Sequence, residues 1–146
     1  MNTYKGYFNP RNPQKYRGDP TNIIYRSRWE LLVMQKLDAH PDVVSWSSEE
    51  IIVPYRSPID GRIHRYFVDF VFTKINNGKK ETVMAEIKPY NQTMPPPKQQ
   101  KTNKRYINEV VTWGINEAKW KAAQEYCADR GWKFQIITEK ELGIKF

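Results

Sequence analysis

The sequence predicts an α/β fold, and three observations carry that prediction. Two runs rich in β-branched and aromatic residues, 66–72 and 82–88, lie on either side of Asn77-Gly78, a strong hairpin turn signal. Apolar residues at three- and four-residue spacing predict two helices, at 27–40 and 116–131. The chain has 146 residues, 39% of them hydrophobic, so we expect one domain with its own core.

The composition indicates which kinds of partner, site and compartment are compatible with this chain. A net charge of +8 favours a polyanionic partner such as nucleic acid. Nine Tyr and five Trp can stack on unpaired bases, although most large aromatics of a folded domain lie in its core. Cys127 is the only cysteine, which excludes an intramolecular disulfide and a cysteine-rich zinc site, and His40 and His64 are well separated. No apolar run reaches the length of a membrane span and the N-terminus carries no hydrophobic signal, so we expect a protein of the reducing cytoplasm.

Residues 1–22 are predicted to form a basic N-terminal arm, and residues 23–146 the folded domain. Pro10, Pro13 and Pro20 exclude a continuous helix in the arm. Against the single acid Asp19, residues 1–28 carry Lys5, Arg11, Lys15, Arg17, Arg26 and Arg28. Such a segment either lies on a partner or on the domain surface, where phosphate contacts make binding salt-dependent, or is an irregular solvated leader.

The first helix is predicted from near Ser27 to near His40, before Pro41. Ser27-Arg28-Trp29-Glu30 matches a capping box, in which the Glu30 carboxylate bonds back to the cap residue. The alternative is that Glu30 is a third acidic group turned toward a metal site. This segment by itself slightly favours the cap.

Strand material follows the helix. We expect strands at 43–46 and 49–55 separated by Ser47-Ser48, a turn at 57–61, and an uninterrupted strand from Ile63 to Phe72. Pro89 withdraws a backbone donor and ends the strand before it.

The C-terminal part begins with an exposed loop at 91–100, which contains three consecutive prolines. Four basic residues without an acid among them follow, Lys98, Lys101, Lys104 and Arg105, and they either contact a DNA backbone or form a solvated face. Residues 105–113 fit a strand or a helix. Asn116 is the predicted cap of the second helix, and a last strand is expected at 132–138.

The chemistry is predicted to lie on the hairpin. Asp69 occurs in a run that is apolar on both faces, and a buried carboxylate needs a partner for its charge. Glu86 and Lys88, two residues apart on the next strand, point the same way. If Asp69 faces Glu86, a divalent cation removes their repulsion, and all-oxygen ligands suit Mg²⁺ or Mn²⁺. The hypothesis is a metal-dependent phosphodiester hydrolase.

The order of helix with Glu30, strand with Asp69 and strand with Glu86-Ile87-Lys88 resembles the PD-(D/E)xK nuclease superfamily, over roughly residues 25–138. The motif lacks its proline, because Phe67-Val68 precede Asp69. Residues 25–30, with Arg and Ser before the helix glutamate, resemble the TnsA-type endonucleases within it. Nearly the whole chain, including residues 18–22, is similar to the head-completion nucleases of T4-like tailed phages.

The resemblance implies a restriction-endonuclease-like core, a mixed central sheet flanked by helices, with one or two Mg²⁺ ions. Asp69, Glu86 and the Ile87 carbonyl would hold the first ion, Glu30 would complete its shell or bind a second, and Lys88 would position the attacking water. The implied substrate is DNA, with packaged ends processed at head completion, in the host cytoplasm or with the virion. Phage head, neck or portal proteins are the implied partners.

Two other functions remain open on the sequence. One is a non-catalytic DNA-binding or virion assembly protein that keeps the nuclease fold and needs no metal. The other is an RNA-directed hydrolase of the same fold, which a basic composition does not distinguish from a DNA enzyme.

Overall fold

The computed structural model describes residues 4–143, so the ends of the predicted arm and domain, residues 1–3 and 144–146, lie outside the described residues. The elements in chain order are β1 (Gly6–Tyr7), η1 (Pro13–Lys15), β2 (Ile24–Tyr25), α1 (Arg28–Ala39), β3 (Val43–Ser48), β4 (Ile52–Arg56), β5 (Ile63–Phe67), β6 (Phe70–Asn76), β7 (Lys79–Ile87), η2 (Tyr90–Gln92), α2 (Lys104–Arg130), β8 (Lys133–Ile137) and α3 (Glu139–Leu142). None of the helices in this range is both long and apolar enough to cross a membrane.

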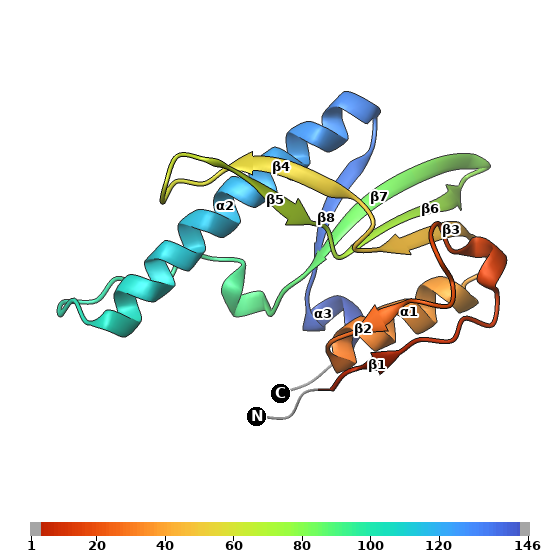
Figure 1. Ribbon diagram of the computed structural model, residues 1–146, viewed down its shortest axis with the longest axis horizontal. Coiled ribbons are helices and arrows are strands. Elements are labelled where there is room, and N and C mark those ends of the chain that lie inside the picture. The colour runs from red at the N-terminus through yellow and green to blue at the C-terminus, as the bar shows by residue number, and fades with distance from the viewer. Residues whose placement is uncertain (1–3, 144–146) are drawn as a thin grey trace.

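A four-stranded mixed sheet in the order β3-β6-β7-β8 forms the centre of the molecule. The β3–β6 and β6–β7 pairs are antiparallel, and the β7–β8 pair is parallel because α2 carries the chain back across the sheet (Figure 1). The predicted mixed sheet with flanking helices is confirmed.

The two faces of the sheet bury two separate apolar clusters. Phe70 and Ala85 pack in the same cluster as Met34 of α1, whereas Met84 packs in the cluster that contains Ala123 and Cys127 of α2. Side chains alternate across a strand, so Ala85 and Met84 necessarily point to opposite faces. The two long helices therefore cover opposite faces, and both faces of the central strands are closed to water.

The β6–β7 hairpin turns at Asn77-Gly78 as predicted. Both residues have positive φ, 52° and 77°, which is the backbone of the tight turn that best matches the twist of paired strands. The register pairs Phe70 with Ala85 and Val71 with Met84. Continued by one residue, this register sets Asp69 opposite Glu86.

The expected uninterrupted strand from Ile63 to Phe72 is wrong. The chain leaves strand geometry at Val68-Asp69, so β5 pairs with β4 in a separate two-stranded sheet while β6 joins the central sheet. The Glu49 N–H donates to the carbonyls of Val68 (3.1 Å) and Asp69 (3.3 Å), and Glu49 itself has φ +55°. These long-range contacts fix a bend that an apolar run does not predict.

The boundary between the two preceding strands also differs from the expectation. The two serines do not separate two strands, as predicted, but form the end of β3. Both are buried, and Ser47 pairs with Val71 and Ser48 with Phe70. The chain turns instead at Glu49, and β4 begins at Ile52. Small serines fit here because the neighbouring surface is occupied by Tyr16, whose hydroxyl contacts the Ser48 backbone.

The second long helix begins earlier than predicted, and its cap lies thirteen residues before the predicted cap. Asn103 is its cap and accepts a hydrogen bond from the Tyr106 N–H at 2.8 Å, and the helix runs from Lys104 to Arg130. Residues 105–113 are thus helical, and the predicted cap Asn116 is a buried residue inside the helix. The predicted end is confirmed, since Gly131 has the left-handed φ of 70°.

The N-terminal segment packs on the domain along α1 and β3. Phe8, Tyr16 and Ile23 are buried in the cluster around Trp46. The buried Asp38 carboxylate at the end of α1 accepts hydrogen bonds from the N–H groups of Arg11 (2.8 Å) and Asn12 (3.0 Å). Of the two possibilities left open for this segment, the described part from Tyr4 to Asn22 follows the domain surface and places some of its side chains in the core.

Candidate active site

Asp69 lies at the bend between β5 and β6, where the chain passes from the outer hairpin into the central sheet. Its Oδ2 accepts a hydrogen bond from the Ile87 N–H at 2.8 Å. This bond ties the carboxylate to the end of β7, next to Glu86. The Glu49 N–H donates to the backbone carbonyls of the bend, so the position of Asp69 depends both on β7 and on the turn between β3 and β4.

Glu86 lies near the end of β7 and is 7% exposed. Residues directly opposite in an antiparallel pair share a face, and the β6–β7 register sets this glutamate opposite Asp69. Its Oε2 accepts a hydrogen bond from the hydroxyl of Tyr66, a buried residue of β5. The site thus draws on both hairpins that meet at the bend.

Glu86 affects the ionisation of the two groups closest to it. Burial, then the charge of Glu86 and a hydrogen bond with the Glu86 carboxyl, raise the pKa of Asp69 well above its ordinary value, and the Ile87 N–H opposes this shift. Burial and the Glu86 charge likewise raise the pKa of the Tyr66 phenol, which stays a hydrogen-bond donor. Among residues 4–143, no lysine, arginine or histidine forms an ion pair with either carboxylate. Glu86, which is buried, and Asp69, which is half-buried, share one site without an ion pair to either of them in the described residues.

Lys88 follows directly after β7 and is half-buried. Its N–H donates to the Ile137 carbonyl at 3.0 Å, which continues the β7–β8 ladder by one residue. Strand alternation therefore puts the Lys88 side chain on the face of Glu86, with Ile87 on the other. The ammonium makes no ion pair within the described residues, so it remains available to an anion.

Glu30 turns back to the start of its own helix. Its carboxylate accepts a hydrogen bond from the Arg26 N–H at 3.2 Å and lies 3.3 Å from the Ser27 hydroxyl, while Ser27 accepts one from the Glu30 N–H. Burial, with the charge of Glu49 added, raises the pKa of Glu30. The charge of Glu30 in turn contributes to the raised pKa of Asp69. In this structure the Glu30 carboxylate bonds to the start of its own helix, and its charge also acts on Asp69.

The carboxyl pair fits a divalent cation through the chemistry of its donors. Within residues 4–143, no group of three or more His, Cys, Asp or Glu side chains is placed to hold an ion by itself. Mg²⁺ is characteristically bound through one or two carboxylates, with water and substrate phosphate completing the shell. Two facing carboxylates with a raised Asp69 pKa meet that requirement, because an ion replaces the proton that keeps the pair from repelling.

The basic residues predicted to contact DNA do not share one environment. Lys15 is occupied, since its Nζ donates to the carbonyls of Asp38 (2.7 Å) and His40 (2.9 Å) at the end of α1. Arg26 pairs with Glu49, and Arg105 pairs with Glu109 at 3.3 Å. The other six predicted contacts have exposed side chains without an ion pair in the described residues: Arg11, Arg17, Arg28, Lys98, Lys101 and Lys104.

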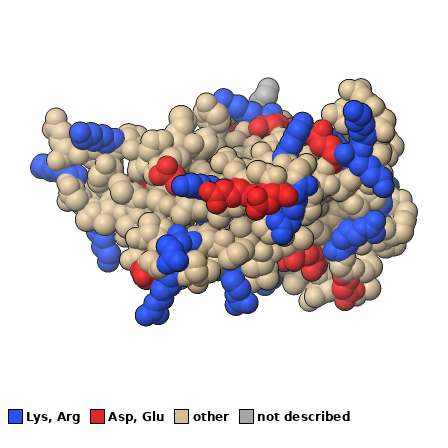
Figure 2. Space-filling model, turned by 90° about the horizontal axis from the view of Figure 1, so that it is seen from above, with Lys and Arg blue, Asp and Glu red and all other residues tan. Residues whose placement is uncertain are grey.

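The excess positive charge is not concentrated on the face seen in Figure 2. Acidic side chains form a line across the middle of this face, with Lys and Arg on both sides and toward its ends. A duplex lying flat on this face would meet repulsion as well as attraction.

Tyr66 and Glu49 are the site residues that sequence reasoning missed. The sequence places Tyr66 only in a strand and gives Glu49 no role, because an uninterrupted strand turns Tyr66 away from Glu86 and offers no acceptor to the Glu49 N–H. The bend at Val68-Asp69 changes both assignments. A positive φ at Glu49 leaves no signal in a single sequence, so neither residue had one.

Two comparisons with known proteins bear on this site. Residues 40–139 match the family described as TnsA-like endonuclease N terminal. That stretch contains Asp69, Glu86 and Lys88 and excludes Glu30. The chain is also similar to the head completion nuclease of Enterobacteria phage T4, with 42% identity over 149 residues, which covers 97% of each protein.

Proposed function

The chain belongs to the TnsA-like endonuclease N-terminal family, and we propose that it is a Mg²⁺-dependent endonuclease that hydrolyses phosphodiester bonds of DNA. The observation that carries the metal dependence is the Asp69–Glu86 pair, in which a half-buried and a buried acid face each other without an ion pair in the described residues and the pKa of Asp69 is raised. A bound divalent ion would convert this unfavourable pair into a ligand set.

Each member of the site has a distinct task in this proposal. Asp69 and Glu86 provide carboxylate oxygens, the Ile87 carbonyl provides a third, and Mn²⁺ suits the same donors. The Ile87 N–H fixes the Asp69 carboxylate, since it already donates to Oδ2. When bound, the ion would supply positive charge beside the scissile phosphate.

Lys88 is the proposed group that acts on the water and the phosphate. It follows Glu86 by two residues, so its ammonium faces the same side of the sheet and can orient the attacking water. The same charge offsets the negative charge that develops on the phosphate oxygens in the transition state. Glu30 has an indirect role in this proposal: it stabilises the start of α1 and adds negative charge near Asp69.

The biological setting follows from the similarity to the T4 head completion nuclease. We propose that the enzyme processes packaged DNA ends when phage heads are completed. Head, neck or portal proteins are then its expected partners, and it acts in the host cytoplasm or with the assembled particle.

Nicking of supercoiled plasmid in Mg²⁺ tests the catalytic proposal. We expect cleavage by the wild type and none by Asp69→Ala, Glu86→Ala or Lys88→Ala. Lys80→Ala and Glu81→Gln are matched controls on the same strand, far from the pair, and should cut like the wild type. If the wild type binds DNA but cuts in neither Mg²⁺ nor Mn²⁺, the protein is a DNA-binding assembly protein; preferential digestion of RNA would redirect the proposal to an RNA hydrolase.

A further inference from the structure

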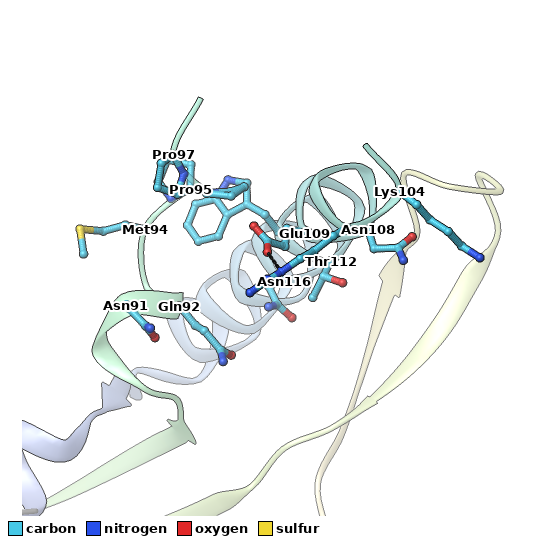
Figure 3. Close-up of a pocket in the computed structure, with 13 residues that line it drawn as sticks. Asn91, Gln92, Met94, Pro95, Pro97, Lys104, Asn108, Glu109, Thr112 and Asn116 are labelled. Atoms are coloured by element: carbon cyan, nitrogen blue, oxygen red, sulfur yellow. Dashed lines mark hydrogen bonds and ion pairs between the residues drawn. The ribbon is translucent and has the colours of Figure 1, made fainter. Parts of the chain in front are cut away.

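A cavity of about 1150 Å³ lies between the loop that follows Lys88 and the N-terminal half of α2 (Figure 3). Asn91 and Gln92 of η2 form part of one wall, with Met94 and the prolines at 95–97 beyond them. None of Asp69, Glu86 and Lys88 lines the cavity, so it is distinct from the carboxyl pair.

The α2 wall of the cavity is a polar stripe. Lys104, Asn108, Thr112 and Asn116 all line the cavity and recur every four residues, which places them on one helix face. In Figure 3, Asn108, Thr112 and Asn116 follow one another along the helix, across from the turn that carries Asn91 and Gln92. One turn further on, the same face carries the buried Trp120, as expected for a helix that packs on a core.

Asn116 shows that this stripe is not simply a solvated surface. It is only 8% exposed, and its amide makes no hydrogen bond within residues 4–143. The amide atoms are nevertheless not sealed off, because the buried side-chain polar atoms without a partner in the described residues are Trp46 Nε1 and Trp120 Nε1, so the Asn116 amide is open to the cavity that it lines. The side chains of Asn108 and Thr112 also have no protein partner in this range. The cavity therefore contains side-chain amide and hydroxyl groups that are free to form hydrogen bonds with a ligand.

The other groups around the cavity indicate the class of that ligand. Amide side chains donate and accept at once, as the edges of nucleobases do. Trp113 and the prolines supply apolar surface, and bases stack on aromatic rings with little dependence on sequence. Lys104 lines the entrance, and the single acid of the lining, Glu109, is neutralised by Arg105. This combination of amides, an aromatic ring and an unpaired cation suits a nucleotide.

The position of the cavity connects it to the cleavage site. Asn91 follows Lys88 by three residues, a separation of at most about 11 Å along the chain. The whole segment from Lys88 to the start of α2, residues 88–103, carries Lys88, Lys98 and Lys101 and no acid. This charge suits the phosphate backbone of a bound DNA strand. A base that is paired in a duplex cannot enter such a cavity, whereas an unpaired one can.

We propose that this cavity binds an unpaired nucleotide of the DNA strand next to the bond that is cut, an inference that rests on the proposed nuclease function. The substrate class is then DNA with a single-stranded segment, such as a frayed or overhanging end. Blunt duplex DNA binds through its phosphates alone.

Equilibrium binding without metal tests the proposal, with fluorescence anisotropy of labelled duplexes that differ only in a single-stranded tail. We expect the wild type to bind the tailed duplex about tenfold more tightly, the size of effect that one stacked base provides. Asn108→Ala/Thr112→Val should reduce this preference to near one without changing the affinity for blunt duplex. Both residues are solvent-accessible, so this variant should fold, and Trp113→Ala gives a second measurement.

The control is Gln124→Ala, an exposed residue of the same helix outside the cavity, which should keep the preference. Equal binding of the two duplexes by the wild type, or an unchanged preference in the cavity variants, overturns the proposal; the second result is also the one expected if the cavity takes a protein segment. Plasmid nicking separates the two proposals. If the wild type nicks DNA but does not prefer the tailed duplex, the nuclease proposal stands and the cavity proposal fails. If it prefers the tailed duplex but cuts no DNA, the cavity proposal stands and the nuclease proposal fails.

Discussion

Replacing Asp69 by Asn should make the protein more stable in the absence of metal while abolishing cleavage. Asparagine keeps an oxygen that accepts from the Ile87 N–H, and its amide can donate to Glu86. The substitution therefore retains the fold contact and removes the repulsion between the two facing carboxylates. An unfavourable buried polar or charged group costs about 1 to 3 kcal/mol, so the free energy of unfolding should rise by about that amount at pH 8.

The pH dependence of this gain distinguishes its cause. Because the folded-state pKa of Asp69 is raised, ionisation disfavours the folded wild type, and the stability due to this group is lost as pH rises from its unfolded value of 3.8 through the raised value. The gain of Asp69→Asn should thus be near zero in acid and grow toward pH 8. Thermal unfolding in EDTA measures it, with an expected shift of about 2 to 12 °C for a chain of this size.

Magnesium should reverse the order of the two proteins. An ion that binds only the folded wild type at one hundred times its dissociation constant adds about 2.7 kcal/mol of stability, and the variant should gain little. Asp42→Asn, at an exposed aspartate away from the pair, is the matched control and should respond to neither pH nor metal in this way. A variant less stable than the wild type at pH 8, or a gain of equal size at every pH, would refute the reasoning.

Substitutions at three further positions test other parts of the structure. Tyr66→Phe removes the hydroxyl that donates to Glu86, and should weaken Mg²⁺-induced thermal stabilisation by freeing that carboxylate to rotate, as a metal titration of the unfolding temperature will show. Glu30→Gln retains an acceptor for the Arg26 N–H and should keep stability, whereas Glu30→Ala should lose about 1 kcal/mol in denaturant unfolding; if Glu30→Gln also stops plasmid nicking, Glu30 is a metal ligand after all. Asp38→Ala leaves two backbone N–H groups of the N-terminal segment unpaired and should cost about 1 to 3 kcal/mol, with faster proteolysis of that segment than in the wild type.

Features set by neighbouring residues were predictable from the sequence. The Ser27 cap, the Asn77-Gly78 turn and the left-handed Gly131 each depend on contacts within a few positions. The same holds for the facing of Asp69 and Glu86, because a two-residue turn and strand alternation together determine which residues oppose.

Features set by distant residues were not predictable. The bend at Val68-Asp69 depends on the Glu49 N–H twenty residues away, and no local residue type marks it. Lys15 was expected to contact DNA, but its ammonium instead binds the carbonyls that end α1, a partner supplied only by the fold. A basic residue in sequence is equally consistent with a phosphate contact and with a helix C-terminus.

Asn116 illustrates a different reason for error. Asparagine is a preferred helix cap, and an apolar stripe follows it, so the sequence favoured a helix start there. Before Asn116 the same face is polar because it lines a cavity rather than the core. The apolar residues of this stretch, Ile107, Val110 and Val111, are exposed instead, so the hydrophobic pattern fits a strand as well as a helix. The wrong helix boundary and the candidate nucleotide cavity therefore have the same physical origin.

The register of one hairpin determines whether this site exists. With the turn at Asn77-Gly78, Asp69 faces Glu86, and Tyr66 reaches the same carboxylate from β5. A slip of one residue between β6 and β7 would oppose Asp69 with Ala85 or Ile87, and would put Asp69 and Glu86 on opposite faces of the sheet. The repulsion between the two facing carboxylates opposes the native register, so the tight turn and the apolar residues on both faces of the strands must outweigh it. The free energy that holds the two acids together thus comes from the packing of the sheet, and the proposed divalent ion would relieve the repulsion at this point.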